Sequence, residues 1–256
     1  MTELTLENIS VRFGALTALS EISFTMSGPA KIGLIGPNGA GKTTLLSAIS
    51  GFVSPSSGSV RLDNLDIMKL PIQSRAEKGI VRSFQTARLL DEETVRTNVL
   101  LGCQPIAGPG SIRQMFATPS YRKWNAKAKE LAQEIEQIVG ISDFSNVQVA
   151  KLPSAMRRFV EIARVLVAKP KVLLLDEPAA GLDDTERRQL ERILHRISGQ
   201  QPTLMVLVEH DVAVVRNVCD YTYVLAEGRL LAQGPTSEVL MDKNVIEAYF
   251  GGADHA

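Results

Sequence analysis

A glycine-rich segment near residue 40 has the residue types and spacing of a phosphate-binding loop. It reads Gly36-Pro37-Asn38-Gly39-Ala40-Gly41-Lys42-Thr43, continues into Thr44, and matches G-x-x-x-x-G-K-[ST] at every fixed position. In such a loop the backbone N–H groups face phosphate oxygens, Lys42 would reach the β- and γ-phosphates, and the Thr43 hydroxyl would ligate Mg²⁺. A short apolar run, 30–35, precedes the loop, and an apolar helix is predicted from Lys42 to just before Gly51. This context favours phosphate binding over an accidental glycine-rich turn, because a helix N-terminus adds its positive dipole end.

Two carboxylates stand at the end of a second apolar run. The run 172–175 leads directly into Asp176 and Glu177. Because the carboxyl ends of parallel strands meet at the ligand edge of a sheet, Asp176 is expected beside the phosphate loop. Asp176 would hold Mg²⁺, mainly through a water, and Glu177 would polarise the attacking water, a role worth about 10²–10⁴ in rate. The alternative is a pair of solvated acids at a strand end.

Two further polar residues, His210 and Gln85, gain a role only once a nucleotide is assumed. His210 follows the apolar run 204–208 and could contact a γ-phosphate or the attacking water, although a lone histidine at a strand end is usually structural. Gln85 could supply its side-chain carbonyl to Mg²⁺. His195 lies in a charged helical stretch and indicates solvated surface.

Alternating apolar residues predict an antiparallel N-terminal part. Residues 9, 11 and 13 are apolar, as are residues 22, 24 and 26, and 60–67 resembles one more strand. Farther along, apolar strands are expected at 172–175, 204–208 and 221–225, each preceded by a helix except the last. This alternation predicts a parallel sheet, extended by a hairpin that turns at Glu227-Gly228.

A mainly helical lobe is expected within the α/β chain. A glycine- and proline-rich loop covers 102–119, and an amphipathic helix follows, carrying Trp124 and Ile138 on its apolar side and ending at Gly140. We therefore predict one domain over 1–256, with the α/β core at 1–89 and 166–256 and the helical lobe at 90–165.

Composition and charge narrow the possible partners. The chain has 28 Lys+Arg and 28 Asp+Glu, so its net charge is zero and no nucleic-acid partner is expected. Cys103 and Cys219 lack metal-ligand spacing and indicate a reducing compartment. The uncharged stretch 43–60 is too rich in Ser, Thr, Gly and Pro to cross a membrane, and the first residues lack the features of a secretory signal. Any membrane role is expected to come through a partner.

The order of these motifs along the chain, together with Gly181-Leu182-Asp183, resembles the nucleotide-binding subunit of an ABC transporter, a P-loop NTPase. The long segment 102–140 and the ending Val245-Ile246-Glu247-Ala248-Tyr249-Phe250-Gly251 are similar to the branched-chain or hydrophobic amino-acid (or urea) uptake group. The resemblance implies ATP and Mg²⁺ as ligands. It also implies that Phe13 stacks on adenine, that Gln85 couples the membrane subunit to Mg²⁺, that Asp183 crosses a dimer interface and that His210 is the switch histidine. Phe13 as an ordinary core residue is the alternative.

One motif departs from the family pattern. The family carries Leu-Ser-Gly-Gly-Gln at a helix N-terminus that donates to the γ-phosphate on the opposite subunit. The matching residues here are Leu152, Pro153, Ser154, Ala155 and Met156, followed by a helix at 157–167. Pro153 brings neither hydroxyl nor N–H, and Met156 replaces an amide with a thioether. We therefore expect a heterodimer with a second ATPase subunit; the alternative is that Ser154 and the helix N-terminus suffice in a homodimer.

The sequence thus predicts the ATP-hydrolysing subunit of an importer, held at the cytoplasmic face of the membrane by integral permease subunits and served indirectly by a solute-binding protein. The permeases are expected to dock around Gln85 and 86–120. The rival is a soluble ABC-type ATPase without a transport role, such as an iron–sulfur assembly scaffold subunit. A DNA-repair ATPase would need long heptad repeats, and a GTPase would need an N-K-x-D tetrad; neither occurs in the sequence.

Overall fold

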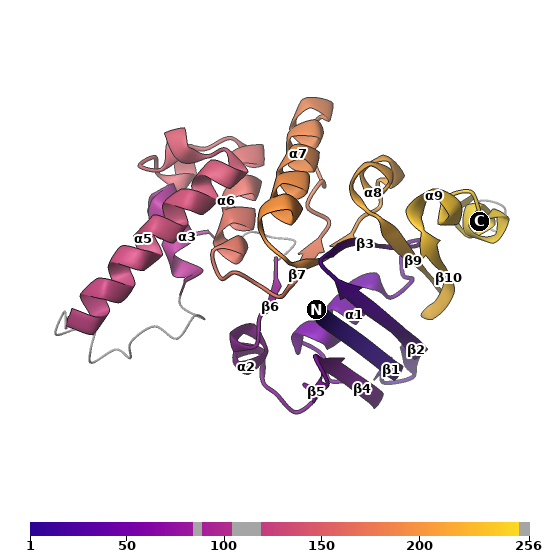
Figure 1. Ribbon diagram of the computed structural model, residues 1–256. Helices are drawn as coiled ribbons and strands as arrows, with labels where there is room; N and C mark the ends of the chain where they lie inside the picture. Colours follow the sequence, from indigo (N-terminus) through magenta and orange to yellow (C-terminus); the bar gives the residue numbers. More distant parts are fainter. Residues whose placement is uncertain (84–88, 104–118, 251–256) are drawn as a thin grey trace.

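The computed structural model describes residues 1–83, 89–103 and 119–250 (Figure 1). Its N-terminal part is a four-stranded antiparallel sheet in the order β2-β1-β4-β5. The strands are β1 (Thr2–Phe13), β2 (Leu16–Gly28), β4 (Ser57–Leu62) and β5 (Leu65–Asp66). The apolar alternation predicted this pairing correctly, since Ile9 and Ile22 face one another in register and are both fully buried.

A six-stranded mixed sheet forms the centre of the molecule, in the order β10-β9-β3-β8-β7-β6. The strands are β3 (Ala30–Ile35), β6 (Ile80–Arg82), β7 (Val172–Asp176), β8 (Leu204–Val208), β9 (Tyr221–Ala226) and β10 (Arg229–Pro235). All neighbours pair in parallel except β10, which returns antiparallel from β9 as the expected hairpin. The parallel arrangement brings the carboxyl ends of β3, β7 and β8 to one edge.

Helices surround this sheet (Figure 1). They are α1 (Lys42–Ser50), α2 (Ile72–Glu77), α7 (Asp184–Gln200), α8 (Val212–Val218), α9 (Thr236–Val239) and α10 (Lys243–Phe250). The predicted α1 is confirmed at both ends, where Gly41 and Gly51 adopt left-handed φ values of 97° and 88°. Helix α7 begins with a capping box in which the Asp183 carboxylate accepts from the Thr185 and Glu186 amides.

The segment between β6 and β7 is helical where the structure describes it. Its elements are α3 (Val95–Leu101), α5 (Pro119–Val139), the 3₁₀ turns η1 (Ser142–Phe144) and η2 (Val149–Lys151), and α6 (Ser154–Leu166). The fully buried Glu136 of α5 accepts from Arg96 of α3 at 2.5 Å and from Ser145 at 2.5 Å. This charge-assisted network fixes α3 and α5 to the turn that follows.

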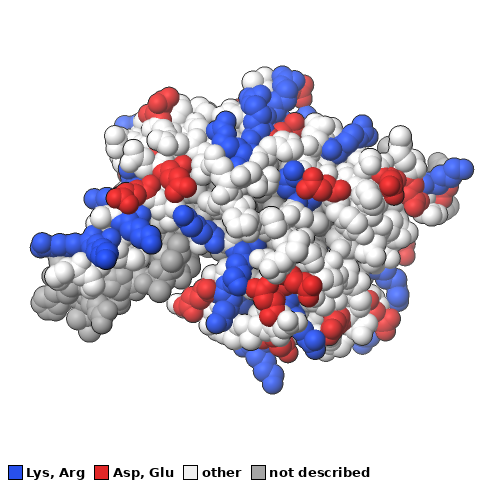
Figure 2. All heavy atoms as spheres, in the orientation of Figure 1, with Lys and Arg blue, Asp and Glu red and all other residues white. Residues whose placement is uncertain are grey.

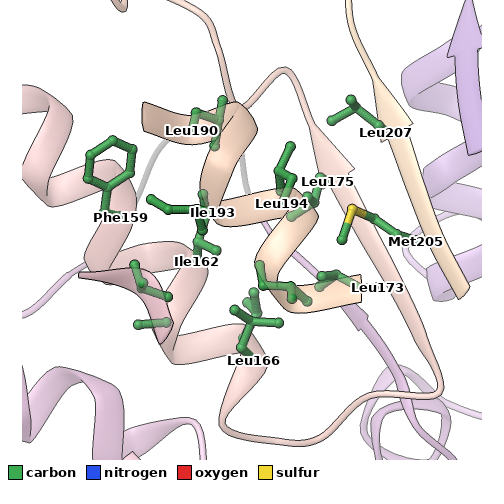
Figure 3. Packing of buried hydrophobic residues seen from close by; sticks show 14 of the residues in the cluster. Phe159, Ile162, Leu166, Leu173, Leu175, Leu190, Ile193, Leu194, Met205 and Leu207 are labelled. Atoms are coloured by element: carbon green, nitrogen blue, oxygen red, sulfur yellow. The ribbon is translucent and has the colours of Figure 1, made fainter. Parts of the chain in front are cut away.

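Helix α6 joins the helical segment to the central sheet. Figure 3 shows Phe159, Ile162 and Leu166 of α6 beside residues of α7 and of β7. Successive residues of β7 point to opposite faces, so Leu173 and Leu175 pack in this cluster while Val172 and Leu174 pack against α1 and the antiparallel sheet. Each fully buried side chain of this size contributes about 1.5–3 kcal/mol. Because one cluster contains residues of α6, α7 and β7, the helical segment and the central sheet are held together by a shared hydrophobic core.

Three sequence expectations were wrong in detail. Residues 60–67 are not one strand, because Asp63 and Asn64 adopt φ values of 49° and 67° and turn β4 into β5. Strand β9 does follow a helix: the Asp211 carboxylate accepts from the Ala213 amide and starts α8. Helix α6 begins at Ser154 rather than at residue 157, so the variant signature residues form its first turn.

The surface carries both signs of charge. On the face drawn in Figure 2, lysine and arginine side chains are interspersed with acidic ones over the helices and over the antiparallel sheet. No helix within 1–83, 89–103 and 119–250 combines the length and the apolar character needed to cross a membrane.

Candidate nucleotide site

The phosphate loop follows β3 and turns where only glycine fits. Gly36 has φ 147°, and a Cβ there would lie 2.0 Å from the Leu225 carbonyl oxygen of β9. Gly41 has φ 97°, and a Cβ there would lie 2.7 Å from the Ala18 carbonyl oxygen of β2. The loop is therefore held between the two sheets with no room for side chains at these positions.

Lys42 is folded back onto its own loop. Its Nζ donates to the Gly36 carbonyl at 2.7 Å and to the Pro37 carbonyl at 2.9 Å, and the residue is 5% exposed. Burial lowers the pKa of Lys42, while the nearby Glu177 and Asp176 raise it. The Lys42 ammonium thus lies at the N-terminus of α1, near Glu177 and Asp176. Phosphate oxygens can replace its two carbonyl acceptors.

Asp176 ends β7 beside the loop, as the parallel sheet requires. The carboxylate is 1% exposed; Thr43 Oγ1 lies 3.5 Å from its Oδ1, and Arg82 Nη2 donates to its Oδ2 at 2.7 Å. A hydroxyl and a carboxylate are hard oxygen donors, the kind that Mg²⁺ takes together with waters and phosphate oxygens. Thr43 and Asp176 therefore fit the Mg²⁺ expected from the loop motif.

Glu177 and His210 form a contact pair at the neighbouring strand ends. His210 Nε2 lies 2.6 Å from Glu177 Oε1, and the side chains are 42% and 19% exposed. Glu177 adopts a left-handed φ of 50°, and its amide donates to the Val208 carbonyl at 2.9 Å. The turn aims the carboxylate out of the sheet and towards the phosphate loop, where a general base must lie.

These residues line one pocket of about 540 Å³. Its lining comprises Phe13, Leu16, Thr17, Ala18, Asn38, Gly39, Ala40, Gly41, Lys42, Thr43, Thr44, Glu177, His210, Glu227 and Gly228. Phe13 is 50% exposed, whereas Ile9 and Val11 on the same strand are buried, so Phe13 is not the core residue that its alternation with them allowed. Its ring is open to the pocket, as stacking on a base requires.

Comparison with known proteins matches this geometry. The family model described as "ABC transporter" matches residues 19–180. The chain belongs to the ABC transporter family. It is the ATP-binding, ATP-hydrolysing kind of subunit, and the soluble iron–sulfur scaffold ATPase weighed above is not favoured.

Individual relatives agree with the family assignment. The branched-chain amino acid transport ATP-binding protein BraF of Pseudomonas aeruginosa is 34% identical over 98% of both chains. The lipopolysaccharide export ATP-binding protein LptB of Haemophilus influenzae is 33% identical, also over 98% of both chains. A solved ATP-binding cassette in its ADP conformation superposes with a TM-score of 0.82 at 31% identity, covering 98% of this chain and 99% of that one.

The variant ABC signature lies away from this pocket, at the start of α6. Pro153 holds the N-cap position and makes no side-chain cap hydrogen bond. Ser154 is exposed, Ala155 is 4% exposed, and the half-buried Met156 packs against the core. The free N–H groups of the first helical turn and the Ser154 hydroxyl are thus the donors this end can offer.

Of the remaining residues singled out in the sequence, the structure describes Asp183 and His195 but not Gln85. Asp183 is exposed, but its carboxylate caps α7 through 2.8 Å contacts with the Thr185 and Glu186 amides. His195 is a surface residue whose Nε2 lies 3.0 Å from the Asn217 carbonyl. Gln85 lies outside the described residues, as does most of the segment 86–120.

Three residues near the site were missed by the sequence analysis. Arg82 pairs with Asp176 and also donates to Ser47 Oγ at 2.9 Å. The Tyr249 hydroxyl of α10 accepts the Gly36 amide at 2.6 Å, and burial raises the pKa of Tyr249. Glu209 is 3% exposed, and burial raises its pKa to about 7. The only sequence signals were the position of Arg82 shortly before Gln85 and that of Glu209 next to His210.

Proposed function

We propose that this chain is the ATP-hydrolysing subunit of an importer for branched-chain amino acids or related small solutes, attached at the cytoplasmic face of the membrane. The ATPase part is carried by the single pocket in which the phosphate loop, Glu177 and His210 meet. The importer part is supported by the similarity to BraF over nearly the whole chain. Integral permease subunits, a second ATPase subunit and, indirectly, a solute-binding protein are the proposed partners.

Nucleotide binding begins with an exchange of acceptors at Lys42. Its ammonium leaves the Gly36 and Pro37 carbonyls for the β- and γ-phosphate oxygens, which are stronger acceptors because they are charged. The loop amides and the α1 dipole bind the same phosphates, and Phe13 stacks on the adenine. Thr43 and Asp176, with Gln85, would hold Mg²⁺, which would offset the charge of the phosphate oxygens.

Hydrolysis then depends on the pair at the strand ends. Glu177 accepts a proton from the attacking water, and His210 holds that carboxylate through the 2.6 Å contact. His210 also lines the pocket, which supports a contact between its side chain and the γ-phosphate. Both side chains lie on short turns after β7 and β8, so the sheet edge sets their spacing.

A transport assay tests the importer proposal. The chain would be purified with its co-expressed membrane partners, reconstituted in vesicles with ATP on its own side, and offered labelled leucine, isoleucine and valine with the solute-binding protein. ATP-dependent accumulation of these amino acids is expected. Extraction of lipopolysaccharide without amino-acid uptake would favour the LptB-like function, and co-purification with soluble proteins alone would contradict a transport role.

The permease is proposed to dock beside β6. A second pocket of about 320 Å³ lies between β6, α3 and α6, on the strand that leads to Gln85. It is lined by Val81, Arg82, Ser83, Leu101, Gly102, Glu161, Arg164, Val165 and Ala168. Such a concave, mixed polar and apolar surface suits an inserted protein segment.

Cysteine cross-linking tests this docking site. Burial raises the pKa of Cys103 to about 11 and that of Cys219 to about 12, so both native thiols are poorly reactive. A cysteine at the exposed Leu101 is expected to cross-link to the permease, and one at Arg188 on α7 is the matched control. Cross-linking only from position 188 would refute the docking site.

The dimer is proposed to be heteromeric. This chain builds a sound phosphate loop but offers a poor lid for its partner, since Pro153 and Met156 replace the expected hydroxyl and amide donors. Each missing charge-assisted bond is worth about 1.5–3 kcal/mol, or roughly tenfold or more in affinity. Light scattering is therefore expected to show that the Glu177→Gln variant with ATP is a monomer when it is the only ATPase present. It is expected to form a dimer when the second ATPase subunit is added. A stable homodimer would contradict the proposal.

A further inference from the structure

Glu209 is a buried carboxylate that has no place in the nucleotide pocket. It follows the last residue of β8 and is 3% exposed. Its neighbour His210 lines the 540 Å³ pocket, as does Glu177, but Glu209 is not among the lining residues. A buried acid is costly unless its oxygens are satisfied, so its partners show what it does.

The Glu209 carboxylate connects two loops. Its Oε1 accepts the Ala179 amide at 2.7 Å, and the backbone N–H of the following residue, His210, helps to lower the pKa of the carboxyl. Ala179 belongs to the loop between β7 and α7, whereas Glu209 and His210 belong to the loop between β8 and α8. A buried backbone donor of one loop is thus satisfied by a buried side chain of the other.

The same two loops carry the proposed catalytic pair. Glu177 lies two residues before Ala179, and His210 directly follows Glu209. Around them, the Glu177 amide donates to the Val208 carbonyl at 2.9 Å, and Arg187 lies 3.2 Å from Asp211. The Arg187–Asp211 pair is partly exposed, whereas Glu209 is buried, so its bond to the Ala179 amide joins the two loops away from solvent.

We propose that Glu209 is a positioning residue that fixes the loop of Glu177 relative to the loop of His210 and thereby sets the rate of ATP hydrolysis. This inference rests on the proposed function of the pair. A misplacement of about 1 Å at a reacting group can cost about 10²-fold in rate. Substitution of Glu209 is expected to leave ATP affinity unchanged. The phosphates are bound by the loop between β3 and α1, whereas the Glu209 carboxylate bonds to the loop between β7 and α7.

Two substitutions grade the effect. Glu209→Ala removes the acceptor of the Ala179 amide, whereas Glu209→Gln keeps a carbonyl for that amide but places an NH₂ group beside the His210 amide. In the assembled transporter, kcat is expected to fall about 10²-fold for Glu209→Ala and about threefold to tenfold for Glu209→Gln, with KM for ATP unchanged. The Kd for ATP, measured on each purified subunit, is expected to stay within about twofold of wild type.

Glu136→Ala is the matched control. Glu136 is equally buried and also joins separate elements, but it lies in the helical segment away from the pocket. Its loss is expected to lower the thermal midpoint without changing kcat. Melting curves on all variants separate a loss of fold from a loss of positioning.

The outcomes distinguish this proposal from the proposed function. A kcat for Glu209→Ala no lower than that of Glu136→Ala, or a fall in ATP affinity equal to the fall in kcat, overturns the positioning role. If Glu209→Ala fails to fold, Glu209→Gln decides, and a wild-type kcat there overturns it. Glu177→Gln is run in parallel: wild-type turnover in that variant refutes the proposed function itself, whereas its loss beside wild-type turnover in both Glu209 variants refutes only the positioning role.

Discussion

The starts of α1 and of α6 are both helix N-termini, yet the chain equips them differently. At the first, Gly41, the buried Lys42 and Glu177 line one pocket, and Asp176 lies beside Thr43. At the second, Pro153 caps nothing and Met156 packs inward. Both ends keep the helix dipole, so the difference lies in side-chain donors.

The difference indicates which part of an ATP site shared between two subunits this chain supplies well. The pocket around Lys42 has a cation, a base and metal-binding oxygens, so it can host the chemistry once a lid is added. The α6 end has backbone N–H groups and one serine, so it makes a weak lid for another subunit. The proposed heterodimer would therefore have two unequal ATP sites, and the active one is expected on this chain.

The largest expected effect is the loss of the base. Glu177→Gln keeps the shape of the side chain and removes its proton acceptor, so turnover in the complex is expected to fall about 10²–10⁴-fold with ATP binding intact. Glu191→Gln on the exposed face of α7 is the control. Steady-state hydrolysis at the wild-type rate would show that Glu177 is not the base.

Removal of the loop cation comes next. Lys42→Ala deletes the ammonium that takes the phosphate oxygens, and ATP affinity is expected to fall on the order of 10²-fold by calorimetry. Lys31→Ala, at the other end of β3, is the matched control and is expected to bind ATP normally. An unchanged affinity in folded Lys42→Ala protein would refute the phosphate-loop assignment.

Restoring the lid should narrow the contrast. Pro153→Ser with Met156→Gln returns a hydroxyl and an amide to the start of α6, and ATP-dependent self-association in the Glu177→Gln background is expected to strengthen roughly tenfold per restored bond. Pro71→Ser, at the similarly uncapped start of α2, controls for helix capping alone. No gain over that control would indicate that the signature variation is not what weakens the lid.

Glu209 gives the site a pH signature. Its pKa is raised from 4.5 to about 7, chiefly by burial, with Glu177 and Asp211 adding to the rise and the Ala179 and His210 amides opposing it. The folded protein therefore binds the Glu209 proton more tightly than the unfolded chain does. This contribution to the stability of the folded state is fully present below about pH 4.5 and is lost as the pH rises through about 7. The free energy of unfolding is expected to fall by on the order of 1–3 kcal/mol across this window. In Glu209→Gln this part of the pH dependence should vanish; an identical profile would contradict the raised pKa.

The smallest expected effect concerns the C-terminal helix. Tyr249→Phe leaves the Gly36 amide without its 2.6 Å acceptor at the entry to the phosphate loop. A lost bond of about 1 kcal/mol should weaken ATP binding by no more than about fivefold. Tyr221→Phe on β9 is the matched control, and equal affinities in the two variants would show that α10 does not support the loop.

Local motifs made much of the site predictable. The phosphate loop, the acids at the end of β7 and the turn at Gly228 each carry their signal within a few residues, and the positions of the main strands followed from apolar runs. The break between β4 and β5 was not predicted, because the apolar residues on both sides of it suggested one strand. The dipeptide Asp63-Asn64 is the local signal for the turn.

Long-range pairing was out of reach. The Tyr249 hydroxyl meets Gly36 across 213 positions, and Arg82 reaches Asp176 across 94. The ending that contains Tyr249 indicated only a family resemblance, and Arg82 belongs to no motif identified in the sequence. The bonds of Lys42 to the Gly36 and Pro37 carbonyls depend on the three-dimensional path of the loop, which no spacing rule describes. Helix α8 was missed because its valines suggest strand and only Asp211 marks its start.

The central claim is that this chain holds the active site of an asymmetric pair. The most direct measurement is ATP turnover in the reconstituted transporter carrying Glu177→Gln in this chain or the equivalent change in the second ATPase subunit. The account predicts that Glu177→Gln nearly abolishes turnover, whereas the partner's change removes only a small part of it. Equal losses from the two substitutions would contradict it.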